Sequence, residues 1–288
     1  MAQVRGAFLY NLSNFNGPIP FNWSRVFIDR ERTEIYVLYQ NFVRVFNENG
    51  MEIYRFGDDS NLGHVVDIAV DRDGTILMLT YTGSESLIVP CNYRGEPVSK
   101  IQIKNLPPEF TGFSPKRLIH REGRFYLADT NSDRIAITDT NGSFQQGYDI
   151  ISILGLQEKD RADKQMVGFS VDKEGNMLFT IPVLFKAYRL SPDGKIADFG
   201  RPGGAPGKFG VVAGIISDNR GNYLVVDKLK CTVMVFDKNY NFLTQFGDRG
   251  LGPGNLIAPD DLTIDGSDRV YVTQSKKRGV NVYKITYD

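Results

Sequence analysis

Four charged residues have the side-chain types that could hold a small polar ligand or an ion. Arg25, Asp67, Lys116 and Asp261 each stand four residues before the residue that opens a recurring turn. Carboxylate oxygens are the ligands that hard divalent cations prefer, so Asp67 and Asp261 are the candidate metal ligands. Each aspartate has a cationic counterpart at the equivalent position, and a set of structural ion pairs is therefore the competing interpretation.

Other catalytic chemistry has little support in the sequence. The motifs GxSxG, HExxH and the phosphate-binding P-loop do not occur in it. The two histidines are His64 and His120, too few on one face for a zinc site built on histidine ligands. Cys91 and Cys231 lack metal-binding spacing and are expected to be core residues. We therefore predict no catalytic residue and no cofactor, with a divalent cation as the alternative.

A repeated unit must position these residues. A segment made of an apolar strand, an Asp-x-x-Gly turn and a second apolar strand recurs along the chain. Recurrence of this kind is typical of folds built from structural repeats. Asp or Asn followed by Gly is typical of tight hairpin turns. A second such turn follows each of the first five at an offset of 18 to 21 residues, so each unit holds four strands. The turn-opening residues are Asp29, Asp71, His120, Asp172, Asp218 and Asp265.

The six units predict an all-β fold, a six-bladed β-propeller with four-stranded antiparallel blades in one domain over residues 1–288. The sixth unit lacks a fourth strand, whereas residues 4–12 form a strand ahead of the first unit. We expect that N-terminal strand to complete the last blade and close the ring, because this removes two exposed sheet edges. The expected blades cover residues 23–57, 64–104, 114–150, 165–200, 211–247 and 258–288 plus 4–12.

Three segments resemble the NHL repeat. Residues 127–139 (LADTNSDRIAITD) are similar to its core, in which an ADxxNxR segment joins the second and third strands. Residues 199–210 and 246–265 resemble its Gly-rich lead-in. The chain is thus similar to the NHL-repeat six-bladed propellers. That resemblance implies one fold but leaves several functions open, because propellers of this type include partner-binding modules, RNA-binding modules, amidating lyases and relatives of lactonases.

The resemblance also implies where a site would lie. One face should carry the starts of the first strands, at the mouth of the central channel, together with the loops between the second and third strands. Glycine is the residue implied at the four charged positions, and it is found at the equivalent Gly168 and Gly214. We therefore expect a polar rim with an opening beside the fourth and fifth blades.

Further candidates should fall on or near the same face. Trp23, His64 and Tyr81 are expected there, and a tryptophan at a rim can anchor a partner or plug the channel. The longest connections, residues 105–113 and 153–165, lead into the third and fourth blades, and long loops on rigid scaffolds often serve recognition. The charged residues of the second connection predict a solvated surface turn.

Composition restricts the partners. Lys plus Arg and Asp plus Glu both number 34, so the formal net charge is zero and we expect no nucleic-acid partner. No apolar run is long enough for a membrane span. We expect a monomeric, stand-alone bacterial protein that acts outside the cytoplasm after removal of an export signal, with the cytoplasm as the alternative.

Three functional hypotheses follow. The first is a non-catalytic binding or interaction propeller that recognises a protein or a small polar ligand on the face that carries the channel mouth. The alternative is a metal-assisted lactonase or lyase that uses Asp67 and Asp261. RNA binding comes third, because the four charges of the rim are balanced. The residues expected to bind the ligand or partner are Arg25, Asp67, Lys116, Asp261, Trp23, His64 and Tyr81.

Overall fold

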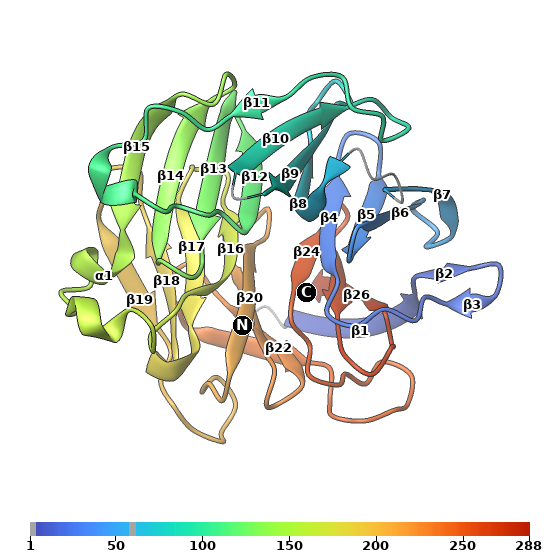
Figure 1. Cartoon of the computed structure of the whole chain (residues 1–288). Helices are drawn as coiled ribbons and strands as arrows, with labels where there is room; N and C mark the ends of the chain where they lie inside the picture. The colour runs from blue at the N-terminus through green and yellow to red at the C-terminus, as the bar shows by residue number, and fades with distance from the viewer. Residues whose placement is uncertain (1–3, 58–61, 84) are drawn as a thin grey trace. The chain divides into compact units, whose positions relative to one another are not determined.

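A computed structural model shows six four-stranded antiparallel sheets (Figure 1). It describes residues 4–57, 62–83 and 85–288. Five sheets are built from strands that follow one another in the chain, and the sixth takes its outer strand from the N-terminal segment. Six sheets of this kind are the blades of a six-bladed β-propeller, so the fold predicted from the repeats is confirmed.

The first three blades contain strands β4 to β15. The strands of blade 1 are β4 (Arg25–Asp29), β5 (Glu34–Tyr39), β6 (Phe42–Phe46) and β7 (Glu52–Phe56). Those of blade 2 are β8 (His64–Val70), β9 (Ile76–Thr82), β10 (Glu85–Cys91) and β11 (Ile101–Gln102). Those of blade 3 are β12 (Arg117–Arg121), β13 (Arg124–Asp129), β14 (Arg134–Asp139) and β15 (Phe144–Asp149).

The last three blades contain the remaining long strands. The strands of blade 4 are β16 (Val167–Val171), β17 (Met177–Ile181), β18 (Lys186–Leu190) and β19 (Ile196–Phe199). Those of blade 5 are β20 (Val212–Ser217), β21 (Tyr223–Asp227), β22 (Thr232–Phe236) and β23 (Phe242–Phe246). Those of blade 6 are β24 (Leu262–Ile264), β25 (Arg269–Thr273), β26 (Val280–Tyr287) and β1 (Val4–Asn11).

Short elements occupy the connections. A small hairpin, β2 (Ser13–Asn14) and β3 (Gly17–Pro18), follows the N-terminal strand. Other connections contain short helices, among them η2 (Pro108–Phe110), α1 (Ile150–Ile153), η3 (Glu158–Asp160) and η4 (Pro182–Leu184). Within the described residues, no helix is long and apolar enough to cross a membrane.

The blades group into two compact units, which we describe separately. Unit 1 consists of Met1–Tyr39, Arg44–Tyr54 and Val167–Asp288, and holds most of blade 1 with blades 4, 5 and 6. Unit 2 consists of Gln40–Val43 and Arg55–Met166, and holds blades 2 and 3.

The turn-opening residues act as local caps. In blade 4, Oδ1 of Asp172 accepts the backbone N–H groups of Glu174 and Asn176 at 3.0 and 2.8 Å, and Gly175 takes a positive φ of 81°. Blade 3 departs from this pattern because His120 replaces the aspartate. Its strands instead join through a two-residue turn with positive φ at Glu122 and Gly123, which is the geometry that suits the twist of a hairpin.

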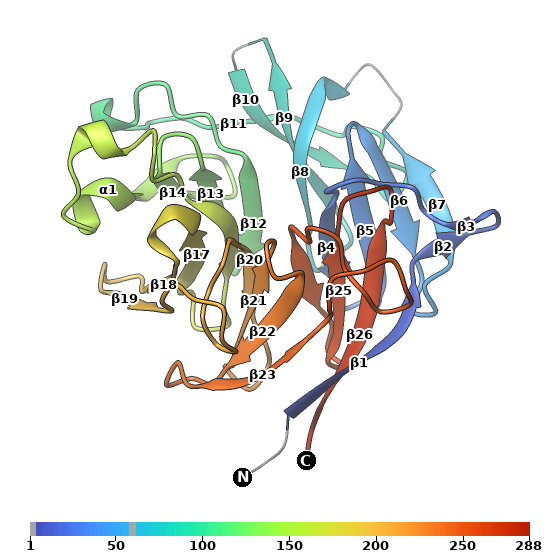
Figure 2. The same cartoon turned by 90° about the horizontal axis from the view of Figure 1, so that it is seen from below.

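The N-terminal strand completes blade 6, as predicted. β1 pairs antiparallel with β26, from Val4 opposite Tyr287 to Asn11 opposite Asn281. Figure 2 shows the two strands running side by side. The buried residues of unit 1 pack mainly between neighbouring blades, and Val4 lies in the cluster that joins blades 5 and 6 with Val233, Phe246 and Ile285. Residues of β1 therefore bury apolar surface as well as closing the last sheet.

The packing of β1 against blade 5 leaves no room for a side chain at Gly6. A Cβ atom added at Gly6 would lie 2.3 Å from Cδ1 of Phe246, which is buried in blade 5. We expect Gly6→Val to lower the free energy of unfolding by about 1–3 kcal/mol through overpacking. The matched control is Ala7→Val, because Ala7 is the next residue of β1 and is exposed. Urea unfolding that gives equal stabilities for the two variants would contradict this account of the closure.

Candidate functional site

A buried carboxylate fixes two loops of unit 1. Asp227 ends β21, and its Oδ2 accepts the backbone N–H of Gly210 at 2.6 Å. Its Oδ1 accepts the N–H groups of Val211 at 3.2 Å and of Lys230 at 2.9 Å. One side chain therefore holds the loop that leads into β20 and the turn between β21 and β22. Hydrogen bonds to the ionised form offset the cost of burying its charge.

Asp129 does the same in unit 2. It ends β13 within the segment that resembles the NHL core, and it is buried. Its Oδ2 accepts the N–H of Ser114 at 2.9 Å and the hydroxyl of Ser132 at 2.7 Å, while Oδ1 accepts the N–H of Asn131 at 3.0 Å. An aspartate at the end of a second strand thus orders the adjacent loops in both units.

Trp23 of unit 1 is exposed and yet held in place. The residue is 55% exposed, and its indole Nε1 donates to the carbonyl of Ala258 at 3.0 Å. Its backbone N–H donates to the carbonyl of Gln274 at 3.0 Å. Its φ of 43° lies in the left-handed region, which is costly for a bulky residue and persists only where the surroundings enforce it.

Lys228 accompanies this tryptophan. Its Nζ lies 5.8 Å from the centroid of the Trp23 ring, within the range of a cation–π interaction. The same ammonium group forms an ion pair with the carboxylate of Asp260. Neither Lys228 nor Asp260 was selected from the sequence, because the contact of Lys228 with Trp23 joins segments more than 200 residues apart and Asp260 is linked to Trp23 only through Lys228.

Arg25 and Asp261 are brought together in unit 1. Nη1 of Arg25 lies 2.8 Å from Oδ2 of Asp261, and both side chains are mostly buried. The Asp261 carboxylate also accepts the backbone N–H of Val26 at 3.3 Å. The pair therefore joins blade 6 to blade 1 of the same unit.

The other candidates lie in unit 2. Oδ2 of the buried Asp67 accepts the backbone N–H of Leu118 at 2.8 Å, which joins blade 2 to blade 3. Nζ of Lys116 lies 4.2 Å from the centroid of the Tyr81 ring. The Tyr81 hydroxyl in turn donates to the carbonyl of Pro115 at 2.6 Å.

His64 stands at the start of β8 and is exposed. Its Nδ1 lies 3.1 Å from Oδ1 of Asn41, in the same unit. Among the residues that the structure describes, no three His, Cys, Asp or Glu side chains group closely enough to hold a metal ion.

The opening expected beside blades 4 and 5 is not formed by the two glycines. A Cβ at Gly168 would lie 2.4 Å from the carbonyl oxygen of Ala213, and one at Gly214 would lie 2.8 Å from Cδ2 of Leu262. Glycine fits these positions because neighbouring blades approach closely here. The opening at the rim beside blades 4 and 5 stays a prediction.

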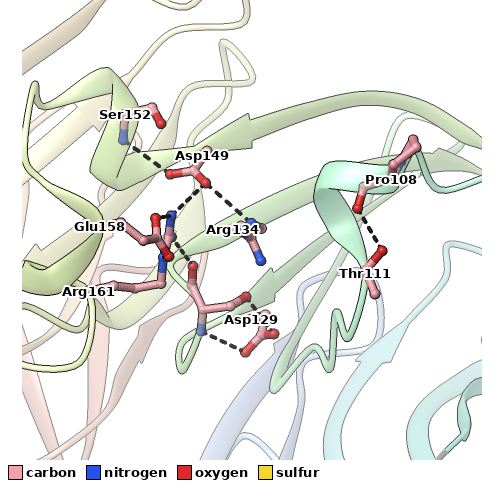
Figure 3. Close-up of polar contacts among 9 residues, drawn as sticks. Pro108, Thr111, Asp129, Arg134, Asp149, Ser152, Glu158 and Arg161 are labelled. Atoms are coloured by element: carbon pink, nitrogen blue, oxygen red, sulfur yellow. Dashed lines mark hydrogen bonds and ion pairs between the residues drawn. The ribbon is translucent and has the colours of Figure 1, made fainter.

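The charged connection before blade 4 is also more than a solvated turn (Figure 3). Arg161 lies mostly buried at its base, where Nη2 contacts Oδ2 of Asp149 at 2.8 Å and Oε2 of Glu158 at 2.6 Å. Its Nη1 donates to the carbonyl of Ser132, next to the turn that Asp129 holds. The hydrogen bonds to Glu158 and Asp149 raise the pKa of Arg161 further, so its charge is fixed.

Another buried carboxylate, that of Asp133, lies beside the network of Arg161. Asp133 is fully buried, and its Oδ1 accepts the N–H of Met166 at 2.6 Å. Its Oδ2 has no hydrogen-bond partner among the described residues. Burial therefore raises the pKa of Asp133 to about 6, although the Met166 bond and the charge of Arg161 act in the opposite direction.

Comparison with known proteins agrees with the propeller fold. Residues 211–288 match a family described as 6-bladed beta-propeller. No curated protein matches the chain.

Several solved structures share the fold at low identity. A catalytically inactive virginiamycin B lyase from Staphylococcus aureus with quinupristin has a TM-score of 0.62 and 10% identity, over 99% of each chain. An auxiliary nutrient binding protein from Bacteroides thetaiotaomicron has a TM-score of 0.66 and 10% identity, over 100% of this chain and 77% of the other. A luciferin-regenerating enzyme has a TM-score of 0.64 and 10% identity, over 98% and 95%. These similarities concern the fold alone.

Asp133 predicts a pH dependence of stability. Its pKa is raised from 3.8 to about 6, so the folded state binds this proton more tightly than the unfolded chain. The resulting stabilisation is complete below pH 3.8 and is lost as the pH rises through about 6. We expect Asp133→Asn to reduce the fall in unfolding free energy over this window by up to about 3 kcal/mol.

Urea unfolding of the wild type and the variant at a series of pH values measures this effect. Asp163→Asn is the matched control, because Asp163 lies in the neighbouring connection and is exposed. Parallel pH profiles for the wild type and Asp133→Asn would show that the carboxyl of Asp133 titrates as it does in the unfolded chain.

Proposed function

We propose that this chain is a non-catalytic binding propeller that recognises a protein partner through the surface around Trp23. The observation that carries the proposal is a tryptophan that is more than half exposed and at the same time fixed by two hydrogen bonds. Large aromatic side chains that lose little conformational freedom on binding are the usual anchors of protein interfaces.

The setting of Trp23 supports this role. Lys228 lies close to its ring and is itself held by Asp260, so the charged group beside the aromatic surface has a defined position. Asp227 fixes the turn on which Lys228 stands. The groups of such a surface are already ordered, so binding costs less conformational entropy and more of the interaction energy contributes to affinity.

We further propose that the chain acts as one domain of the NHL type, and that Arg25, Asp67, Lys116, Asp261, His64 and Tyr81 contribute to binding of the ligand or partner. The similarity of residues 127–139, 199–210 and 246–265 to the NHL repeat supports this assignment. A solved propeller named as a nutrient binding protein is compatible with a binding role, and a small polar ligand is the second form that such a role could take.

A metal-assisted lactonase or lyase remains the alternative, with Asp67 and Asp261 as its metal ligands. The two carboxylates already accept backbone N–H groups of Leu118 and Val26, and Asp261 is paired with Arg25. These contacts favour a structural role for both residues. The lyase among the solved structures shares the fold at 10% identity, which gives its activity no weight here.

A random peptide library selected on the immobilised protein tests the binding role. We expect the selected peptides to bind Trp23→Ala at least about tenfold more weakly than the wild type, because an aromatic anchor commonly contributes more than 1.4 kcal/mol. Tyr93→Ala is the matched control, since Tyr93 is an exposed aromatic residue of unit 2 and should leave binding unchanged. Peptides that bind both variants equally well would place the binding surface elsewhere and overturn the proposal.

A further inference from the structure

The loops around Trp23 carry an excess of positive charge, although the whole chain is neutral. Segments 228–230, 248–260 and 276–278 of unit 1 contain six basic residues and two acidic ones. The basic residues are Lys228, Lys230, Arg249, Lys276, Lys277 and Arg278, and the acidic ones are Asp248 and Asp260. We call these three segments with Trp23 the cationic patch.

Hydrogen bonds join the patch into one continuous surface. The backbone N–H of Lys277 donates to Oδ1 of Asn22, the residue before Trp23. Arg278 donates to the carbonyl of Leu251 at 2.9 Å, and Arg249 donates to the carbonyl of Leu229. Lys228, the residue before Leu229, contacts the Trp23 ring through its ammonium group.

Most of the positive charge in the patch is not neutralised by these contacts. Lys230 donates to the carbonyls of Ala205 and Lys208 at 2.9 and 2.6 Å, and Arg249 and Arg278 also donate to carbonyls, which carry no net charge. Lys228 has an acidic partner in Asp260. Lys276 and Lys277 are exposed. The surface therefore has a positive potential that attracts anionic groups and weakens with salt.

Exposed apolar side chains lie among these cations. Leu229 is 56% exposed and Leu251 is 74% exposed, in addition to Trp23. Each leucine has its own carbonyl bound by an arginine of the patch, so both are held on the cationic surface. The phosphate groups of a nucleic acid and the sulfate groups of a polysaccharide bind cationic side chains but make no favourable contact with leucine. A peptide, by contrast, can present acidic and apolar side chains together.

We propose that the cationic patch binds an acidic protein segment that also carries apolar side chains. This inference rests on the proposed function and adds the chemistry of the partner. The carboxylates of the segment face Lys276, Lys277 and Lys228, and its apolar side chains pack on Trp23, Leu229 and Leu251. Charge complementarity of this kind sets the choice of partner and the rate of association.

The test uses three short synthetic peptides without tryptophan. One repeats Glu-Leu-Asp-Phe, the second replaces the acidic residues with lysine, and the third contains acidic residues and glycine only. Binding is measured by the anisotropy of labelled peptide and by the emission of Trp23, the one tryptophan of the chain. We expect the first peptide to bind most tightly, to shift the emission of Trp23, and to lose affinity as salt is raised.

Charge removal makes the test specific. The double variant Lys276→Asn and Lys277→Asn removes two exposed charges at positions with φ of 60° and 55°, which asparagine tolerates. We expect it to bind the first peptide about three- to tenfold more weakly. The control, Lys195→Asn and Lys238→Asn, removes two exposed lysines from turns of blades 4 and 5 outside the patch and should bind as the wild type does.

Other outcomes overturn the inference in distinguishable ways. Binding of heparin or poly(U) in place of the first peptide would identify a polyanion without apolar groups as the partner. Preference for the lysine peptide, with a shift in Trp23 emission, would contradict the acidic segment and leave the binding role of Trp23 intact. Equal weakening by the patch and control variants would show that only the net charge matters.

Discussion

Buried aspartates at the ends of second strands hold the loops on which the candidate surfaces depend. Asp227 binds three backbone N–H groups from two loops of unit 1, and Asp129 binds three N–H groups and a hydroxyl in unit 2. A buried charge is tolerated only when its hydrogen-bonding capacity is used, so each carboxylate requires its loops to stay in place. The loops are thereby ordered before any partner binds.

This constraint explains how a repeated scaffold displays an individual surface. The blades and their turn caps recur, whereas the residues that the aspartates hold differ from blade to blade. In unit 1 the held turn carries Lys228, Leu229 and Lys230, beside a tryptophan supplied by the segment that leads into blade 1. Arg161 acts similarly in unit 2, where a guanidinium bound by Asp149 and Glu158 anchors the charged connection.

The repeats were sufficient to predict the six sheets, their strand order and the completion of blade 6 by residues 4–12, because a hydrophobic strand pattern and turn residues are local signals. The surface around Trp23 could be predicted from the sequence only in part. Its contacts with Ala258 and Lys228 span more than 200 residues, and no local pattern encodes the positive φ of Trp23. The basic clusters at 228–230 and 276–278 were visible in the sequence and, together with the repeat, would have indicated a cationic face. The close approach at Gly168 follows from packing between blades, which the sequence does not reveal.

The proposed role of Trp23 requires the side chain to be both exposed and immobile before any partner binds. Acrylamide quenching combined with time-resolved anisotropy of its emission measures the two properties directly, because the chain has a single tryptophan. We expect efficient quenching together with an anisotropy that decays only with the rotation of the whole protein. A ring protected from acrylamide, or one with a large fast component of anisotropy decay on the nanosecond scale, would contradict it.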